Sequence, residues 1–333
     1  MMRMVKLAIA LGLAWSVYWL ASGYLLRQSL SGWFEEQAAR GWQAEVADLS
    51  TSGFPLRHVT RLESPALADP ATGTAWQADW LELDSPAIWP GQQTVRFAET
   101  PQYLSYFDQT VILTAAGMTA DLHLRPGTAL QVQRMALTAG PWVLADAAGP
   151  LAGARTLGLE MDQLERPETY AVRIGAEDFT PGARLRETVA QGEGLPAGFE
   201  AAELAMTVTF DRPWDRGALE DRRPQPVAID LALAELQWGP MRLKATGAVT
   251  VDPAGVPDGR VTLKAENWRE MLALAQASGV LPAVAAASVE TALSLLARIG
   301  GNPDALDVDL DFEGGMVALG PLTLGPAPLL ILR

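Results

Sequence analysis

The hydrophobic pattern of the chain begins with one long uncharged run. Residues 7–26 contain no charged side chain, and as a helix they measure about 30 Å, the thickness of the hydrocarbon core of a bilayer. Aromatic side chains gather in the second half of the run, where an interfacial belt is expected. We therefore predict a cytoplasmic tip and transmembrane helix over residues 1–27. The anchoring residues are Leu7, Leu11, Leu13, Trp15, Trp19, Leu20, Leu25 and Leu26.

Helical spacing continues after this run and then gives way to alternation. Residues 28–44 keep apolar side chains on one helical face, which predicts a helical stalk that ends near Gly41. From Val46 onward, apolar and polar positions alternate, and this period predicts half-buried strands of antiparallel sheets. The clearest alternating runs are residues 118–125, 204–211, 241–246 and 306–313.

Turn residues separate the predicted strands. Pro126-Gly127, residues 252–255 and residues 257–259 all have the composition of hairpin turns. The pattern is weakest around residue 150, so we predict one β-rich half over residues 45–150 and a second over 151–333.

Helical patterns interrupt the strands twice. A short helix is predicted near residues 181–191. A helical hairpin is predicted over about 267–277 and 282–299, because Asn267 and Glu270 have the spacing of a capping box and two glycines follow residue 299.

The predicted fold is therefore mainly β: an N-terminal transmembrane helix, large antiparallel twisted sheets of about 15 to 20 strands, and a small helical hairpin near the C-terminus. An amphipathic sheet has to cover its apolar face, either against a second sheet in a sandwich or by curling into a trough. The residues predicted to line either interior, or an apolar groove, are Leu204, Met206, Val208, Val227, Ile229 and Leu231.

The uncharged run also resembles a secretory signal peptide. Residues 21–23 are small and would suit a cleavage site, but the apolar run continues past them through Leu26. We favour an uncleaved anchor. Arg3 and Lys6 precede the run, so the N-terminus is expected to stay cytoplasmic and the rest of the chain to be exported.

The amino-acid composition excludes several classes of function. The net charge of −14 excludes the basic face that nucleic-acid binding needs, and the absence of cysteine excludes disulfides and thiolate metal sites. With 49% hydrophobic and 19% charged residues, the exported part can bury a core.

Candidate chemistry is sparse. His58 and His123 are the only histidines, and no spacing places them with a nucleophile or further metal ligands. The sequence has no nucleophile elbow, P-loop or zincin motif, so we predict no catalytic residue, no metal site and no cofactor.

An acidic ladder is the sharpest polar feature. Alternation places these carboxylates on one strand face: Asp307, Asp309, Asp311 and Glu313. We expect a solvated face paired across strands with Arg242 and Lys244 or with Arg260 and Lys264. The two alternatives for these carboxylates are a calcium site and a face that recruits a protein partner.

Six ordered segments resemble one known family, the domain of unknown function 2125 family. They are Gly41–Gln43, Ser52–Arg57, Pro65–Pro70, Trp238–Gly247, Glu266–Glu270 and Leu319–Pro328. One turn, Glu313–Met316, departs from the expected Asp-Gly-Arg. The resemblance implies an uncharacterised, membrane-anchored envelope protein of Gram-negative bacteria. Together with the single apolar helix, it leads us to expect a single-pass protein of the inner membrane with its bulk in the periplasm. It implies no activity. The layout is also similar to AsmA-like envelope proteins, whose β-sheets are open to lipid, which is an analogy of fold alone.

These observations lead to one main functional hypothesis and two alternatives. The main hypothesis is a non-enzymatic envelope protein that holds lipid or acyl chains in an apolar β-groove. A protein-interaction module in envelope assembly is the first alternative. A hydrolase that uses a carboxylate pair is the second.

Overall fold

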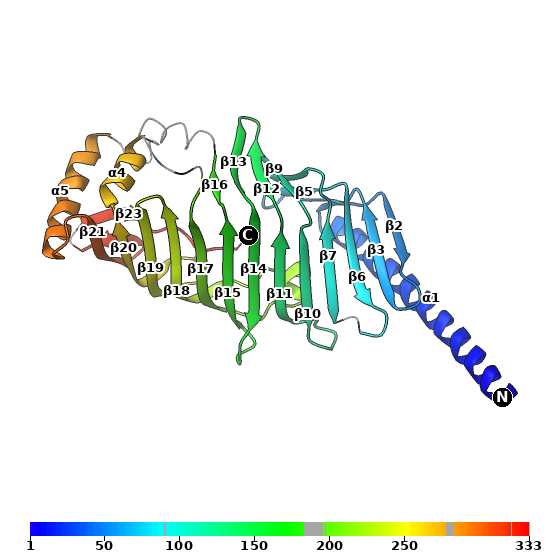
Figure 1. Ribbon diagram of the computed structural model, residues 1–333. Coiled ribbons are helices and arrows are strands. Elements are labelled where there is room, and N and C mark those ends of the chain that lie inside the picture. The colour runs from blue at the N-terminus through cyan, green and yellow to red at the C-terminus, as the bar shows by residue number, and fades with distance from the viewer. Residues whose placement is uncertain (90, 183–195, 197, 278–282, 321, 333) are drawn as a thin grey trace.

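The N-terminal segment forms one long helix. The computed structural model describes residues 1–89, 91–182, 196, 198–277, 283–320 and 322–332, and α1 (Met2–Ala39) joins the predicted anchor to the predicted stalk without a break (Figure 1). The helix ends at Ala39, close to the predicted Gly41 and before the predicted outer bound at residue 44. Gly41 has a φ of +96°, and the N–H of Trp42 bonds to the carbonyl of Gln37, which terminates the helix before residue 44.

Two antiparallel sheets follow. The larger has 15 strands, in this order: β2 (Asp48–Ser52), β3 (Arg57–Glu63), β6 (Trp80–Pro86), β7 (Gln92–Phe97), β10 (Thr119–Leu124), β11 (Val132–Ala139), β14 (Thr156–Gln163), β15 (Thr169–Glu177), β17 (Ala201–Phe210), β18 (Pro226–Trp238), β19 (Met241–Val251), β20 (Pro257–Glu266), β21 (Ala305–Glu313), β22 (Met316–Leu319) and β23 (Leu322–Pro326). The smaller has eight: β1 (Gln43–Glu45), β4 (Ala66–Asp69), β5 (Thr74–Gln77), β8 (Gln102–Tyr106), β9 (Gln109–Ala115), β12 (Trp142–Asp146), β13 (Gly149–Ala154) and β16 (Thr180–Pro181). Strands from both predicted halves therefore share the same sheets.

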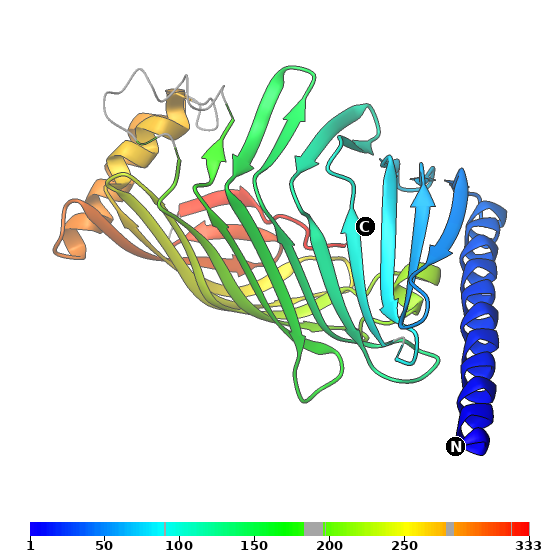
Figure 2. The same cartoon turned by 45° about the vertical axis from the view of Figure 1, so that its right-hand side comes forward.

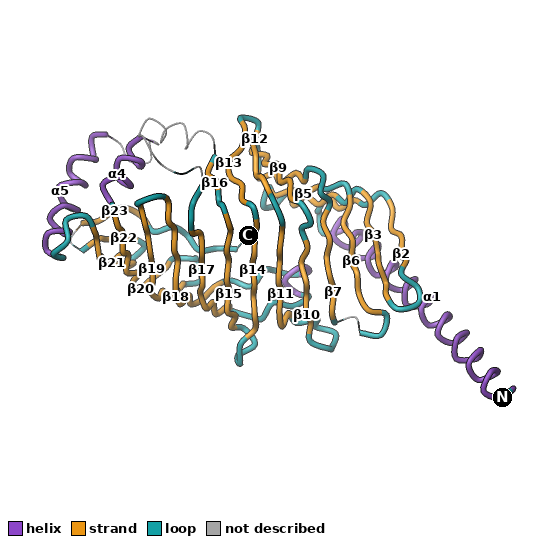
Figure 3. The backbone as a smooth tube through the Cα atoms, viewed as in Figure 1, coloured by secondary structure: helices purple, strands orange, loops and turns teal. Residues whose placement is uncertain are grey.

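Three further helices complete the described part of the chain: α3 (Gly217–Glu220), α4 (Trp268–Ala277) and α5 (Ala283–Ile299). α4 and α5 confirm the predicted helical hairpin, and the short α3 was not predicted. The predicted short helix near residues 181–191 lies mostly outside the described residues. Figure 3 shows the helices at the two ends of the sheet and behind its middle.

In the N-terminal half, strands of the larger sheet continue into the smaller sheet through sharp bends. β3 turns into β4 at Ser64-Pro65, where Ser64 has a φ of +48°, and β11 turns into β12 at Gly140-Pro141. Small buried residues line the bends: Ala78, Ala98, Ala115 and Ala139. Because these side chains are small, the two sheets approach closely, and the smaller sheet forms the upper rim in Figure 1.

The larger sheet curls, and its apolar face lies on the inside of the curl. Figure 2 shows the C-terminal strands turning behind the middle strands, with α3 on that same hidden side and α1 beside the N-terminal edge of the sheet. We call this the concave face and the opposite, polar side the convex face. The curled trough is therefore the architecture observed.

Two glycines permit close contact between β19 and β20. Gly247 has a φ of +156° and Gly259 a φ of +144°, and a Cβ on either would collide with a backbone carbonyl of the neighbouring strand. The turn predicted at residues 257–259 is wrong, because these residues lie inside β20. The glycine that suggested a turn instead allows the sheet to bend there.

Candidate functional site

The concave face carries the predicted groove residues on two adjacent strands. Met206 pairs with Leu231 and Val208 pairs with Ile229, so β17 and β18 place these side chains together. Leu204 lies on the same face of β17. Val227 differs, since it lies at an irregularity in the pairing near the start of β18 and is exposed.

The structure extends this surface far beyond the predicted residues. Cross-strand partners form a row over ten consecutive strands of the larger sheet, from β10 to β22. Its members are Leu122, Met135, Met161, Val172, Met206, Leu231, Gly247, Val261, Leu310 and Leu319. A parallel row contains Ala120, Leu137, Leu159, Ile174, Leu204, Ala234, Ala245, Leu263 and Val308. We call them the long row and the second row. Alternation alone could have identified each member, but only the register shows that they align.

Two parts of the concave face are covered. Near one end of the central strands β14, β15 and β17, Tyr170, Val172 and Phe210 pack with Trp214 from the loop that carries α3. The Tyr170 hydroxyl accepts a hydrogen bond from the backbone N–H of Trp214 at 3.0 Å. Elsewhere, α4 and α5 pack on the sheet through Trp268 and Ala297. These clusters cover part of the concave face in the described part of the chain.

The middle of the concave face is more open. Leu204, Met206, Leu231, Leu263 and Leu310 all keep an intermediate exposure, although they lie within the strands of a 15-stranded sheet. In a closed sandwich, central side chains of this size would be buried. The concave face thus offers a continuous apolar surface that the described part of the protein covers only partly.

The convex face contains the acidic ladder. Its carboxylates meet side chains of β20: Asp307 lies 3.3 Å from Lys264 Nζ, Asp309 accepts from Thr262 Oγ1 at 2.7 Å, and Asp311 lies 2.6 Å from Arg260 Nε. The predicted pairing with Arg260 and Lys264 is therefore observed. The other predicted partners, Arg242 and Lys244, instead lie within 3.4 Å and 3.2 Å of Glu235. Glu313 ends β21.

α1 is attached to the edge of the larger sheet through His58. The His58 ring stacks on Trp19 at 4.9 Å, and its Nε2 lies 2.9 Å from Ser22 Oγ. Burial lowers the pKa of His58, so the neutral ring is favoured. His123 lies on the convex face, opposite Gln92 and Arg134. The sequence did not predict the link between His58 and the helix, since these contacts join residues far apart along the chain.

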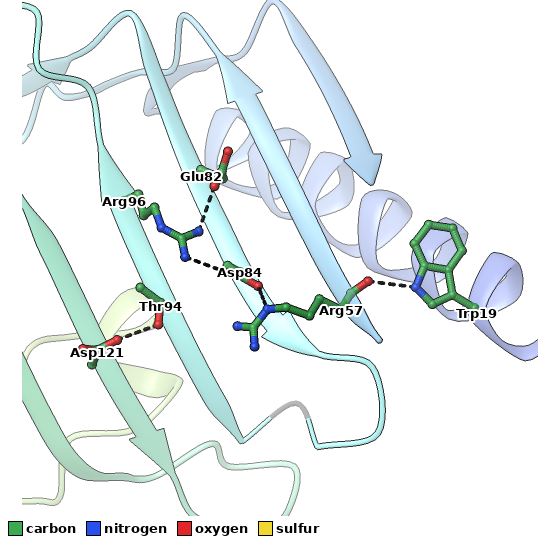
Figure 4. Close-up of polar contacts among 7 residues, drawn as sticks. All are labelled: Trp19, Arg57, Glu82, Asp84, Thr94, Arg96 and Asp121. Atoms are coloured by element: carbon green, nitrogen blue, oxygen red, sulfur yellow. Dashed lines mark hydrogen bonds and ion pairs between the residues drawn. The ribbon is translucent and has the colours of Figure 1, made fainter. Parts of the chain in front are cut away.

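A buried carboxylate on the convex face organises the strands beside α1 (Figure 4). Asp84, of which 5% of the side chain is exposed, accepts hydrogen bonds from Arg57 and, at 2.8 Å, from Arg96, and Arg96 also bonds to Glu82 at 2.9 Å. Burial raises the pKa of Asp84, but the two guanidinium groups outweigh it and hold the pKa below its usual 3.8. The network ties together β3, β6 and β7.

Replacing Asp84 with asparagine is expected to lower the free energy of unfolding by about 1–2 kcal/mol at pH 7, since both arginines are partly exposed and screened. The pKa of Asp84 is lower in the folded state, so its contribution is full above the unfolded value near 3.8 and disappears as the pH falls through the folded value. Denaturant unfolding at pH 7 and pH 3 measures both effects. Asp121→Asn, at an exposed position on the same face, is the control, and equal stability of Asp84→Asn and the natural protein at pH 7 would contradict the prediction.

Three carboxyl groups of the described residues have a clearly lowered pKa, namely Asp84, Asp211 and Asp221. Neighbouring arginines lower the pKa of Asp84 and Asp221, and the Gln225 backbone N–H together with arginines lowers that of Asp211. A general acid needs a raised pKa instead. The described residues also contain no group of three or more His, Asp or Glu that could hold a metal ion.

Two surface hollows lie away from the concave face. One of about 250 Å³ is on the smaller sheet, with Trp76 and Tyr103 in its lining. The other, of about 500 Å³, lies at the turn after β19. There the Asp252 carboxylate accepts hydrogen bonds from the N–H groups of Ala254 and Val256, so it holds the turn.

The apolar helix is the remaining feature. α1 is long and apolar enough to cross a membrane, with a mean hydropathy of 1.6 in its most apolar window, and most of that window is exposed. A signal sequence has the same character.

Comparison with known proteins identifies one family. The family described as "Uncharacterized protein conserved in bacteria (DUF2125)" matches residues 19–328, nearly the whole chain. No curated protein matches the chain.

Proposed function

Because the chain belongs to the DUF2125 family, which is described as uncharacterised, we propose a function from the geometry of this chain: it is a membrane-anchored envelope protein that holds lipid acyl chains on its concave face. The mechanism is passive. The apolar surface shields acyl chains from water, and α1 keeps this surface beside the membrane that supplies the lipid.

The long row and the second row carry this proposal. Met161 and Val172 of the long row are buried, but Met206 and Leu231 beside them are only partly buried although they are large and apolar. Each of these two would gain from further burial. A methylene group that leaves water contributes about 0.8 kcal/mol, so about ten methylenes of an acyl chain contribute on the order of 8 kcal/mol. A row of aliphatic side chains without charged neighbours on the same face suits a chain-like, apolar ligand.

The contacts of α1 support its retention as an anchor. Cleavage after residues 21–23 would remove Trp19 and Ser22, which hold His58, and would leave that buried ring without its stacking partner. α1 also runs without interruption through the small residues that resemble a cleavage site. We therefore propose a single-pass protein of the inner membrane with its sheets in the periplasm.

The alternatives receive less support. An acidic face that recruits a protein partner would need carboxylates without neighbouring cations. Asp307 and Asp311 instead lie against Lys264 and Arg260. A hydrolase of this kind would need a carboxyl group with a raised pKa. The carboxyl groups of the described residues whose pKa is clearly displaced have a lowered pKa.

Site-specific photocrosslinking in cells tests the proposal. A benzophenone amino acid placed at Leu204 of the full-length protein points to the concave face, and we expect ultraviolet light to attach a lipid that mass spectrometry identifies by its added mass. The same probe at the neighbouring Glu203, an exposed position on the convex face, is the matched control.

A lipid adduct at Leu204 but not at Glu203 would support the acyl-binding role. A protein adduct at Leu204 would favour the interaction module instead. Equal lipid labelling at both positions would indicate contact with bulk membrane and would contradict a dedicated binding face.

A further inference from the structure

Two loops of the larger sheet carry exposed apolar side chains beside α1. They are residues 53–56, between β2 and β3, and residues 87–89, which follow β6 on the way to β7. Neither loop contains a charged residue. Leu56 and Ile88 are each 72% exposed, and Phe54 and Trp89 are also exposed. A concentrated apolar surface of this kind indicates an interaction site.

The loops are bonded to the apolar segment of α1. Three aromatic donors of the helix bond to backbone carbonyls: Trp15 Nε1 to Pro55 at 3.0 Å, the Tyr18 hydroxyl to Ala87 at 2.8 Å, and Trp19 Nε1 to Arg57 at 2.8 Å. Figure 4 shows the last of these. The Leu56 carbonyl accepts from the Ala87 N–H at 2.9 Å, which joins the two loops. An unpaired backbone carbonyl in hydrocarbon costs several kcal/mol, and these bonds remove that cost at Pro55, Leu56, Arg57 and Ala87.

The attachment points fix the depth of the loops. At 1.5 Å per residue, Trp15 lies about 16 Å and Trp19 about 10 Å before Leu26, the end of the uncharged run. The part of α1 that precedes Trp15 is only about 20 Å long, which is too short to cross a hydrocarbon core of about 30 Å. If α1 crosses the membrane, the loops bonded at Trp15 and Tyr18 must therefore lie within it.

We propose that the tips of the β2–β3 and β6–β7 loops insert among the acyl chains of the leaflet that surrounds the second half of the apolar segment. The loop between β14 and β15, at the same end of the sheet in Figure 2, contains Glu165 and Arg166 and lies farther from α1, so apolar character is concentrated next to the anchor. The inference rests on the proposed insertion of α1, but it does not require a ligand on the concave face.

Spin labels measure the depth directly, because the chain has no cysteine of its own. The full-length variants Leu56→Cys and Ile88→Cys are labelled with a nitroxide and reconstituted into vesicles of phosphatidylcholine and phosphatidylglycerol. Collision with oxygen, which enters lipid, is compared with collision with a water-soluble nickel chelate. Val17→Cys, at an exposed position of α1, is the membrane reference, and Val143→Cys, at an exposed position of β12, is the aqueous reference.

We expect the labels at positions 56 and 88 to collide with the chelate about tenfold less often than the label at 143, since a charged complex is excluded from hydrocarbon. Labels at 56 and 88 that match position 143, while position 17 reports lipid, would overturn loop insertion and leave the anchor intact. If position 17 also matches position 143, α1 is not inserted and both proposals fail.

Discussion

Replacing Met206 and Leu231 together with aspartate is expected to abolish lipid crosslinking from position 204 while the protein still folds. The two residues are cross-strand partners at the centre of the long row, and both are partly exposed to solvent. Their carboxylates would stay hydrated in the free protein, but a bound acyl chain would strip that hydration at a cost of several kcal/mol. At 1.4 kcal/mol per factor of ten, the loss of affinity should reach roughly a hundredfold or more.

A matched control separates ligand binding from added charge. Ala205→Asp combined with Ala248→Asp introduces the same two carboxylates on the convex face, where they would lie opposite Arg173 and Arg260. This control should keep its lipid adduct. If both double variants lose the adduct equally, the effect comes from charge or folding, and the concave face is not the binding surface.

Trp268→Ala is expected to have the largest effect on stability, lowering the free energy of unfolding by about 3–5 kcal/mol. Trp268 is 2% exposed, and its indole N–H donates to the carbonyl of Pro303 at 3.1 Å. Truncation leaves a cavity between α4, α5 and the sheet beside Ala265, Ala297 and Leu306. Denaturant unfolding of the full-length protein in detergent, followed by circular dichroism, measures the change.

Leu295→Ala provides the comparison within the same helical hairpin. Leu295 is 61% exposed, so its truncation should change the free energy of unfolding by less than about 0.5 kcal/mol. A similar loss for both variants would mean that the hairpin is sensitive to any truncation, and that Trp268 does not hold it to the sheet.

The local patterns of the sequence predicted the strands well. Residues 118–125, 204–211, 241–246 and 306–313 all correspond to observed strands, because alternation reports directly which side chains face the core. The helical hairpin was also predicted correctly, since helical spacing and the glycines after residue 299 are local signals. The side chain of Asn267, predicted as part of a capping box, instead donates to the carbonyl of Pro240. Family membership was predicted from ordered motifs and is confirmed by the match over residues 19–328.

The long-range features could not be predicted from those patterns. The bend at Ser64-Pro65 divides one extended segment between two sheets, and an alternating pattern is the same on either side of it. Gly259 is a residue type typical of turns, but here it lies in β20 and allows the backbone of β19 to approach closely. Trp15 and Trp19 were predicted as anchor residues, and only the folded chain shows that they also bond to Pro55 and Arg57.

The order of the strands in the larger sheet has a consequence for how the chain can assemble. From β2 to β23, every strand of this sheet lies beside the sheet's previous and next strands along the chain, with no strand inserted out of order. Each newly synthesised strand therefore meets an edge that is already complete, beginning with the edge that α1 supports. The sheet can grow in the order of synthesis and needs no late rearrangement, and β23, the last strand to join, forms its C-terminal edge.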